Sequence, residues 1–84
     1  MVIYRPQRGG LAESMAERKE FPDLKQMLEH VVKEHGGAFD LDEIFIAYYC
    51  FDARINWETY IVTVTRYGNK VYPFPQAIGY CTFV

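Results

Sequence analysis

The chain has 84 residues, of which 50% are hydrophobic and 17% aromatic, and its formal net charge is −2. This composition excludes a disordered chain, and the length favours a single domain near the lower size limit for a fold without cross-links. The weak charge disfavours a general duplex-DNA binder. No hydrophobic run reaches about 18 residues, so we expect no membrane-spanning helix. The opening residues lack a signal-peptide pattern, and we expect a cytoplasmic protein.

The two cysteines, Cys50 and Cys81, are expected to be free, buried thiols. Cytoplasmic proteins rarely keep disulfides, and a cysteine on a strand usually packs as a small apolar side chain. No CxxC or HExxH motif is present, and the spacing of His30 and His35 places them on different sides of a helix, where we expect solvated side chains. The sequence therefore predicts no metal site and no cofactor.

The N-terminal part of the chain predicts short elements. Residues 2–5 form an apolar strand that Pro6 limits to a strand end or a sheet edge. After a turn at residues 7–10, a helical turn is indicated by the spacing of Leu11, Ala12, Met15 and Ala16. Residues 18–21 are expected to be extended, and a polar edge strand over residues 15–21 fits less well.

The clearest helix follows Asp23, which can cap its N-terminus, with Gln26 three residues later as in a capping box. The hydrophobic positions have the spacing of an amphipathic helix and comprise Leu24, Met27, Leu28, Val31 and Val32. Gly36 and Gly37 are expected to end the helix. The side chains of Met27, Leu28 and Val31 should face a sheet.

The second half of the chain predicts three consecutive strands. Residues 44–51 are hydrophobic on both faces, which is typical of a central strand or one covered on both sides. Residues 52–56 form a turn, and residues 57–66 a second strand, rich in β-branched residues. Its even positions from Tyr60 to Val64 make an apolar face, and Trp57 lies on the other face with Ile61 and three threonines.

The third strand is separated from the second by a hairpin turn at Gly68 and Asn69. Pro73 and Pro75 then predict a loop or a broken edge over residues 70–76, before a last strand at residues 77–83. The elements together predict an α+β fold. We expect an antiparallel sheet of three to four strands with one main amphipathic helix on one face.

One helix can cover only one face of this sheet. The second face of the strand at residues 44–51 must therefore contact the N-terminal segment, a second copy of the chain or a ligand. Self-association is the simplest solution because twofold homodimers are the commonest oligomers. We therefore expect a homodimer.

Two segments carry the candidate binding residues. Arg5 and Arg8 precede Gly9, Gly10 and the start of a helical turn, a pattern that suits a phosphate, although a solvated turn explains so short a motif more simply. The second segment runs from residue 52 to residue 60. Asp52 and Arg54 can pair across the turn there, and that pairing alone can explain both residues.

Trp57 and Tyr60 add aromatic surface that suits a nucleobase or a partner protein. Because they are three apart on one strand, they should point to opposite faces, and Trp57 is equally well explained as a core residue. No catalytic residue is assigned. Ser14, the one serine, lacks a GxSxG context, and strand cysteines more often pack than react.

The opening YRPQRGGLAESMAE, the segment DARINWETYIVTV and the closing AIGYCTF resemble a group of small phage and prophage proteins of unknown function. The resemblance rests on a YRP-x-R start, a D-x-R-I-x-W motif and a final strand that contains glycine. It implies a mobile-element protein in a bacterial host cytoplasm, and such accessory proteins commonly block host factors.

The expected function is therefore a non-enzymatic binding module that blocks a host defence factor or sequesters a small ligand. One alternative is a nucleic-acid-binding module that uses Arg5, Arg8, Arg54 and Trp57. The other alternative is a small enzyme with cysteine or aspartate chemistry.

Overall fold

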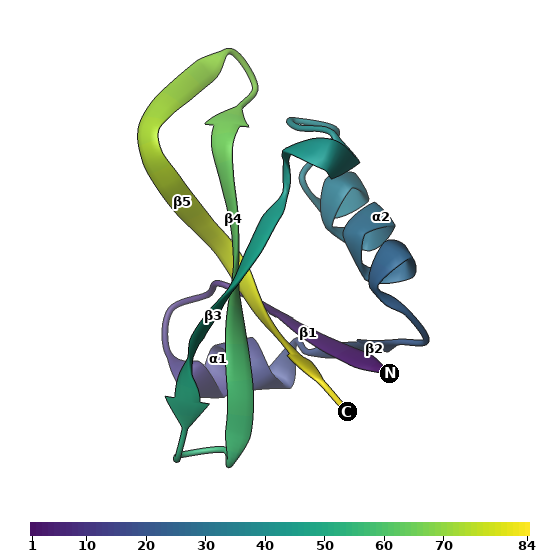
Figure 1. Ribbon diagram of the computed structural model, residues 1–84, viewed down its shortest axis with the longest axis vertical. Helices are drawn as coiled ribbons and strands as arrows, with labels where there is room; N and C mark the ends of the chain where they lie inside the picture. The colour runs from purple at the N-terminus through teal and green to yellow at the C-terminus, as the bar shows by residue number, and fades with distance from the viewer.

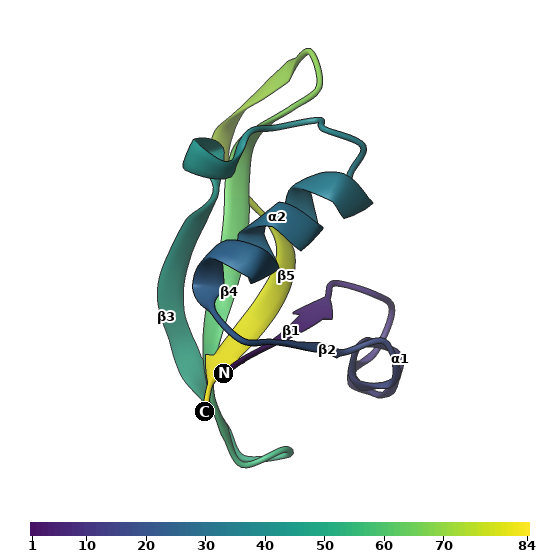
Figure 2. The ribbon, with the colours of Figure 1, turned by 90° about the vertical axis from the view of Figure 1, so that its right-hand side faces the viewer.

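The computed structural model describes residues 1–84 and contains one antiparallel sheet of five strands with one main helix, α2, across one face (Figures 1 and 2). The elements are β1 (Val2–Pro6), α1 (Leu11–Ala16), β2 (Lys19–Phe21), α2 (Leu24–Glu34), the 3-10 turn η1 (Leu41–Glu43), β3 (Phe45–Asp52), β4 (Trp57–Tyr67) and β5 (Lys70–Phe83). In space the strand order is β2-β1-β5-β4-β3. The α+β class is confirmed, and the sheet is larger than the three to four strands expected.

The additional strand is β2, which the sequence predicted only as an extended segment. It pairs with β1, whose other side pairs with the C-terminal part of β5. Strand β1 is therefore internal to the sheet, and Pro6 stands at its last position, where the loss of one N–H group interrupts little of the ladder. The N-terminus thus joins the sheet beside the last strand of the chain.

Strand β3 lies at an edge of the sheet, where it pairs with β4 alone. The expectation of a central or doubly covered strand is wrong. Hydrophobic residues on both faces of a strand indicate that side chains on both faces favour burial. They do not indicate whether the strand has one or two neighbouring strands in the sheet. In consequence, several large side chains of β3 remain exposed.

Strand β5 continues through Pro73 and Pro75, where a loop or a broken edge was expected. Its pairing with β4 is irregular there, because the register shifts between Val64 and Arg66. Strand β1 pairs only with residues 79–83 of β5, so the proline-containing part has no neighbour on that side. Proline is tolerated because few ladder hydrogen bonds are required of this segment.

Helix α2 begins and ends as the sequence predicts. The Asp23 carboxylate accepts a hydrogen bond of 2.8 Å from the backbone N–H of Gln26, and Gly36 and Gly37 have the positive φ angles, 63° and 72°, that let the chain leave the helix. Met27 and Val31 are fully buried against the sheet. Both pack in a core cluster with Val2, Tyr4, Phe39, Val62, Val64, Ile78 and Cys81.

Substitution of Met27 tests this packing. Met27→Ala should lower the free energy of unfolding by about 2–5 kcal/mol, because it leaves a cavity at a fully buried position. Leu28→Ala should cost less, since Leu28 is only partly buried. Urea denaturation measures both, with the exposed Leu24→Ala as the control. If Met27→Ala and Leu24→Ala lowered the free energy of unfolding equally, Met27 would not face the sheet as described.

A bidentate ion pair fixes η1 to the sheet. The Arg66 guanidinium donates two hydrogen bonds to the Glu43 carboxylate, one of them at 2.8 Å, and a third to the carbonyl of Gly68 in the hairpin turn. The hydrogen bonds from Arg66 lower the pKa of Glu43 from 4.5 to about 2. The segment before β3 is thereby held against the end of β4.

The lowered pKa of Glu43 predicts a pH-dependent contribution to stability. The contribution should be complete above pH 4.5 and lost as the pH falls towards 2, because the unfolded chain binds the proton more readily than the folded chain. Glu43→Gln should flatten this part of the stability profile, as measured by thermal melts from pH 2 to pH 6. The control is Glu29→Gln on the exposed side of α2, which should leave the profile unchanged.

Candidate functional site

The far face, meaning the sheet face opposite α2, carries a polar hollow of about 170 Å³. It lies where α1 and the turn before it meet β1, β3 and β5, and Figure 2 shows α1 beside β1 and apart from α2. The buried Ser14 hydroxyl donates a hydrogen bond to the carbonyl of Pro6 and so holds α1 at the end of β1. We call this cavity the Arg5 hollow, and its charged and aromatic lining residues are Arg5, Arg8, Tyr49, Asp52, Arg54 and Tyr80.

Four of the six binding residues predicted from the sequence therefore lie together. The two segments that carry them, around residue 5 and around residue 52, are far apart in the chain. They meet because β1 and β3 both lead to the same end of the far face. The sequence alone did not predict that these two segments would be neighbours.

A β-bulge directs Asp52 into the hollow. Tyr48 pairs with Tyr60, but Cys50 and not Tyr49 pairs with Thr59, so β3 contains one extra residue. A bulge of this kind shifts the alternation of side chains by one. Asp52 consequently lies on the same face as Arg5, whereas regular alternation from Ile46 would turn it to the α2 side.

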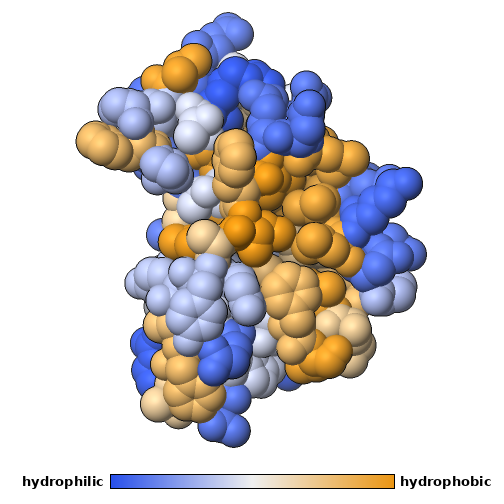
Figure 3. Space-filling view, viewed as in Figure 1, coloured by the Kyte–Doolittle hydropathy of each residue, from blue (hydrophilic) through white to orange (hydrophobic).

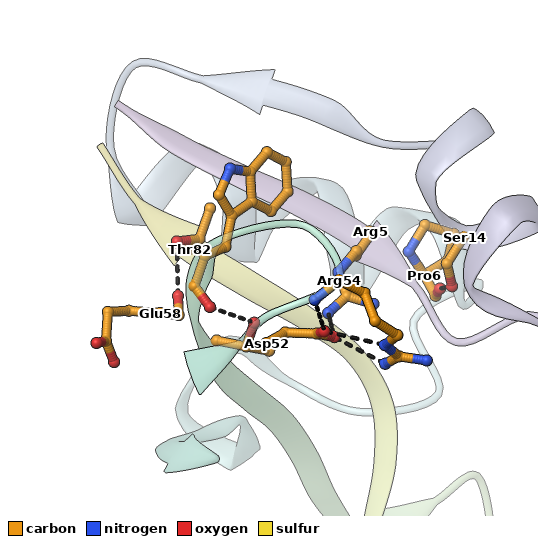
Figure 4. A network of polar contacts seen from close by, with 9 residues as sticks. Arg5, Pro6, Ser14, Asp52, Arg54, Glu58 and Thr82 are labelled. Carbon is orange, nitrogen blue, oxygen red and sulfur yellow. Dashed lines mark hydrogen bonds and ion pairs between the residues drawn. The ribbon is translucent and has the colours of Figure 1, made fainter. Parts of the chain in front are cut away.

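Asp52 is bound by Arg54 in a bidentate pair, as the sequence predicted (Figure 4). Arg54 Nε lies 3.0 Å from Asp52 Oδ1, Nη2 lies 2.7 Å from Oδ2, and the Arg54 backbone N–H also donates to Oδ1 at 3.1 Å. The hydrogen bonds from Arg54 lower the pKa of Asp52 and raise that of Arg54. The buried carboxylate is therefore ionised at neutral pH and its two oxygens are occupied.

Arg5 makes weaker contacts with its neighbours than Arg54 does. Its side chain is only 7% exposed, yet the guanidinium approaches Asp52 Oδ2 no closer than 3.9 Å (Figure 4). The guanidinium carbon lies 4.8 Å from the centre of the Tyr80 ring, a distance typical of a cation–π contact. Neither contact is a hydrogen bond.

Arg8 stands at the rim of the hollow, with its side chain about half exposed and its Nε 2.9 Å from a Glu17 carboxylate oxygen. The Glu13 carboxylate lies over Gly9. An acidic side chain therefore lies beside the turn that the sequence suggested for phosphate binding. In addition, α1 has only six residues, too few for a strong dipole.

Trp57 and Tyr60 point to opposite faces, as expected, and only Trp57 lies on the far face. Trp57 pairs in register with Asp52 and is partly buried, but it does not line the hollow. Tyr60 packs against the core on the α2 side, with its ring centre 5.1 Å from that of Phe83 and 5.5 Å from that of Tyr48. The structure therefore does not bring Tyr60 to the other candidate residues.

Two aromatic residues of the hollow were missed. Tyr80 is the register partner of Arg5 in the β1–β5 pairing, and its ring centre lies 5.7 Å from that of Tyr49. Both tyrosines are visible in the sequence as strand residues. Nothing in the local sequence indicates that β5 pairs with β1. The contact between Tyr80 and Arg5 could therefore not be predicted from the sequence.

The two histidines border a second hollow of about 460 Å³ between α2 and β1. The expectation that they are simply solvated is wrong. His30 packs against the rings of Phe21 and Tyr4, and His35 Nδ1 lies 3.0 Å from the hydroxyl of Tyr67. Burial is the main cause that lowers the pKa of each histidine.

No protein-family model, no curated protein and no solved structure matches the chain. The structure brings together no group of three or more His, Cys, Asp and Glu side chains that could hold a metal ion. Neither helix has the length and continuous hydrophobicity that crossing a membrane requires.

Removal of the Asp52 charge tests the polar cluster. Asp52→Asn should lower the melting temperature by several degrees, because the buried Arg5 then loses the nearest negative charge. The exposed Asp42→Asn serves as the control and should change it little. Adding Arg5→Met to Asp52→Asn should restore part of the loss. If the Asp52→Asn protein were as stable as the Asp42→Asn protein, the Asp52 charge would not stabilise Arg5.

Proposed function

We propose that the protein is a non-enzymatic binding module, of the kind carried by phages and prophages, that blocks a partner protein through the edge strand β3. The observation that supports this proposal is the exposure of four aromatic side chains on one strand with a free edge. They are Phe45 (57% exposed), Tyr48 (54%), Tyr49 (56%) and Phe51 (49%).

An exposed edge strand is a template for pairing with another chain. Natural proteins usually protect such an edge with lysine, proline or a β-bulge. The sequence of β3, FIAYYCFD, contains neither lysine nor proline, and its one bulge lies between Tyr48 and Cys50. Figure 3 shows hydrophobic atoms gathered across the middle of the side that β3 crosses in Figure 1. An added strand would gain backbone hydrogen bonds from the edge and side-chain burial from the aromatic rings.

Two kinds of partner fit this edge. A second copy of the chain can pair β3 with β3 about a twofold axis, which is the homodimer expected from the sequence. A host protein with an exposed strand can bind in the same way. Binding of β3 to the exposed strand of the host protein would then prevent that host protein from binding its normal partner.

The alternative functions have weaker support. For a nucleic-acid interface, Arg54 is already paired with Asp52 and Arg8 with Glu17, which leaves little free positive charge on the far face. For a cysteine enzyme, burial raises the pKa of the Cys81 thiol to about 11, far from the low values of reactive thiols. Both cysteines are free, as predicted, but the expectation that both are buried is wrong for Cys50, which is only partly buried.

The β3 edge is tested by placing lysine on it. Phe45→Lys and Phe51→Lys change exposed side chains, so the fold should persist while pairing is lost. The control is Val71→Lys, at a position 73% exposed in the hairpin of β5. Light scattering at micromolar concentration should show a wild-type dimer that the β3 variants, but not the control, convert to a monomer.

A monomeric wild type would exclude the second copy as the partner. In that case a host protein captured from bacterial lysate should be retained by the wild type and by Val71→Lys, and lost with both β3 variants. Retention that is equal for all four proteins would contradict the use of the β3 edge.

A further inference from the structure

Arg5 is a buried cation whose hydrogen-bonding groups have no acceptor in the chain. A guanidinium has five N–H donors, and burial of such a group without hydrogen bonds is costly. The Arg5 side chain is 93% buried, and its nearest carboxylate oxygen is 3.9 Å away, beyond hydrogen-bonding distance. No side-chain nitrogen is both fully enclosed and unpaired, so the Arg5 donors must open into the hollow that Arg5 lines.

Three arginines and three carboxylates surround the hollow, but they are not paired one to one. Asp52 offers one negative charge, and Arg54 already takes both of its oxygens at 2.7–3.1 Å. Glu17 is paired with Arg8, and Glu13 lies over Gly9, at the α1 side. Arg5 is therefore the one arginine of the hollow that makes no hydrogen bond to a carboxylate, and its nearest carboxylate oxygen is one that Arg54 already binds.

We infer that the Arg5 hollow binds a small organic phosphate, with its phosphate group on Arg5. Guanidinium groups bind phosphate through paired, planar hydrogen bonds, and a phosphate supplies the acceptors that Arg5 lacks. Arg8 and Arg54 are paired with Glu17 and Asp52, but their side chains are 53% and 70% exposed, and the N–H groups outside those pairs can donate from the rim. This inference does not depend on the β3 edge.

The organic part of the ligand is expected to be a planar ring. Tyr49 and Tyr80 line the hollow beside Arg5, and Tyr49 leaves more than half of its surface exposed. A ring attached to the phosphate can stack on Tyr49 at the mouth of the hollow, as bases stack on aromatic side chains in proteins that bind single strands. A volume of about 170 Å³ suits a phosphate with its first attached atoms, not a whole nucleotide.

The experiment compares inorganic phosphate, adenosine 5′-monophosphate and adenosine at constant ionic strength. Melting temperature and the fluorescence of Trp57, the single tryptophan, which pairs in register with Asp52, are followed during each titration. Both phosphates should raise the melting temperature in proportion to the logarithm of concentration above their Kd, the monophosphate at lower concentration. Adenosine alone should have no effect.

Arg5→Met separates this inference from a purely structural role of Arg5. Without ligand the variant should melt at or above the wild-type temperature, because an apolar side chain of similar length replaces a poorly compensated buried charge. It should bind the monophosphate at least about tenfold more weakly, since the main charge-assisted hydrogen bonds are lost. Arg18→Met, which removes an exposed arginine outside the hollow, should bind as the wild type does.

Three results would overturn the inference. The first is a wild type that responds to neither phosphate. The second is an equal response to adenosine and its monophosphate, which would show that the phosphate is not recognised. The third is unchanged binding by Arg5→Met or, if that variant fails to fold, by the exposed Arg8→Gln, which should weaken binding several-fold.

Discussion

One helix of eleven residues must stabilise a sheet of five strands, and the rest of the structure follows from this constraint. Met27 and Val31 bury the middle of the sheet on one face, and Phe39, after the helix, completes the core. The far face has only α1, which reaches β1 and the hollow beside it. Strand β3, the strand farthest from β1 and β2, is left without a covering element.

The far face is stable without a second helix because its strand residues are suited to partial exposure. Thr59, Thr63 and Thr82 are buried there, and each hydroxyl donates to a backbone carbonyl. Threonine side chains fill this face and satisfy their hydroxyl groups, so the face does not expose a large apolar area to water. The largest group of exposed aromatic side chains lies on β3, and charged side chains gather at the Arg5 hollow. The two proposed functions use these two regions.

The sequence predicted what local interactions determine. Helix α2, its Asp23 cap, the two faces of β4, the hairpin at Gly68 and the Asp52–Arg54 pair all depend on residues within a few positions of one another, and all are present. The position of β3 at an edge, the pairing of β1 with β5 and the packing of Phe39 depend on distant partners. Hydrophobic pattern carries no information on which strands become neighbours, and those predictions were wrong or missing.

The bulge at Tyr49 shows why the site itself could not be assembled from the sequence. Strict alternation along β3 from Ile46 places Asp52 on the α2 side, away from Arg5, so a correct strand assignment would still have separated the two residues. The extra residue reverses the alternation and brings Asp52 to the hollow, and it also leaves Tyr49 outside the regular pairing with β4. Tyr49 thus belongs both to the exposed β3 edge and to the lining of the hollow. A chain that pairs with β3 and a ring that stacks on Tyr49 would contact the same side chain, so occupation of either region would change the surroundings of the other.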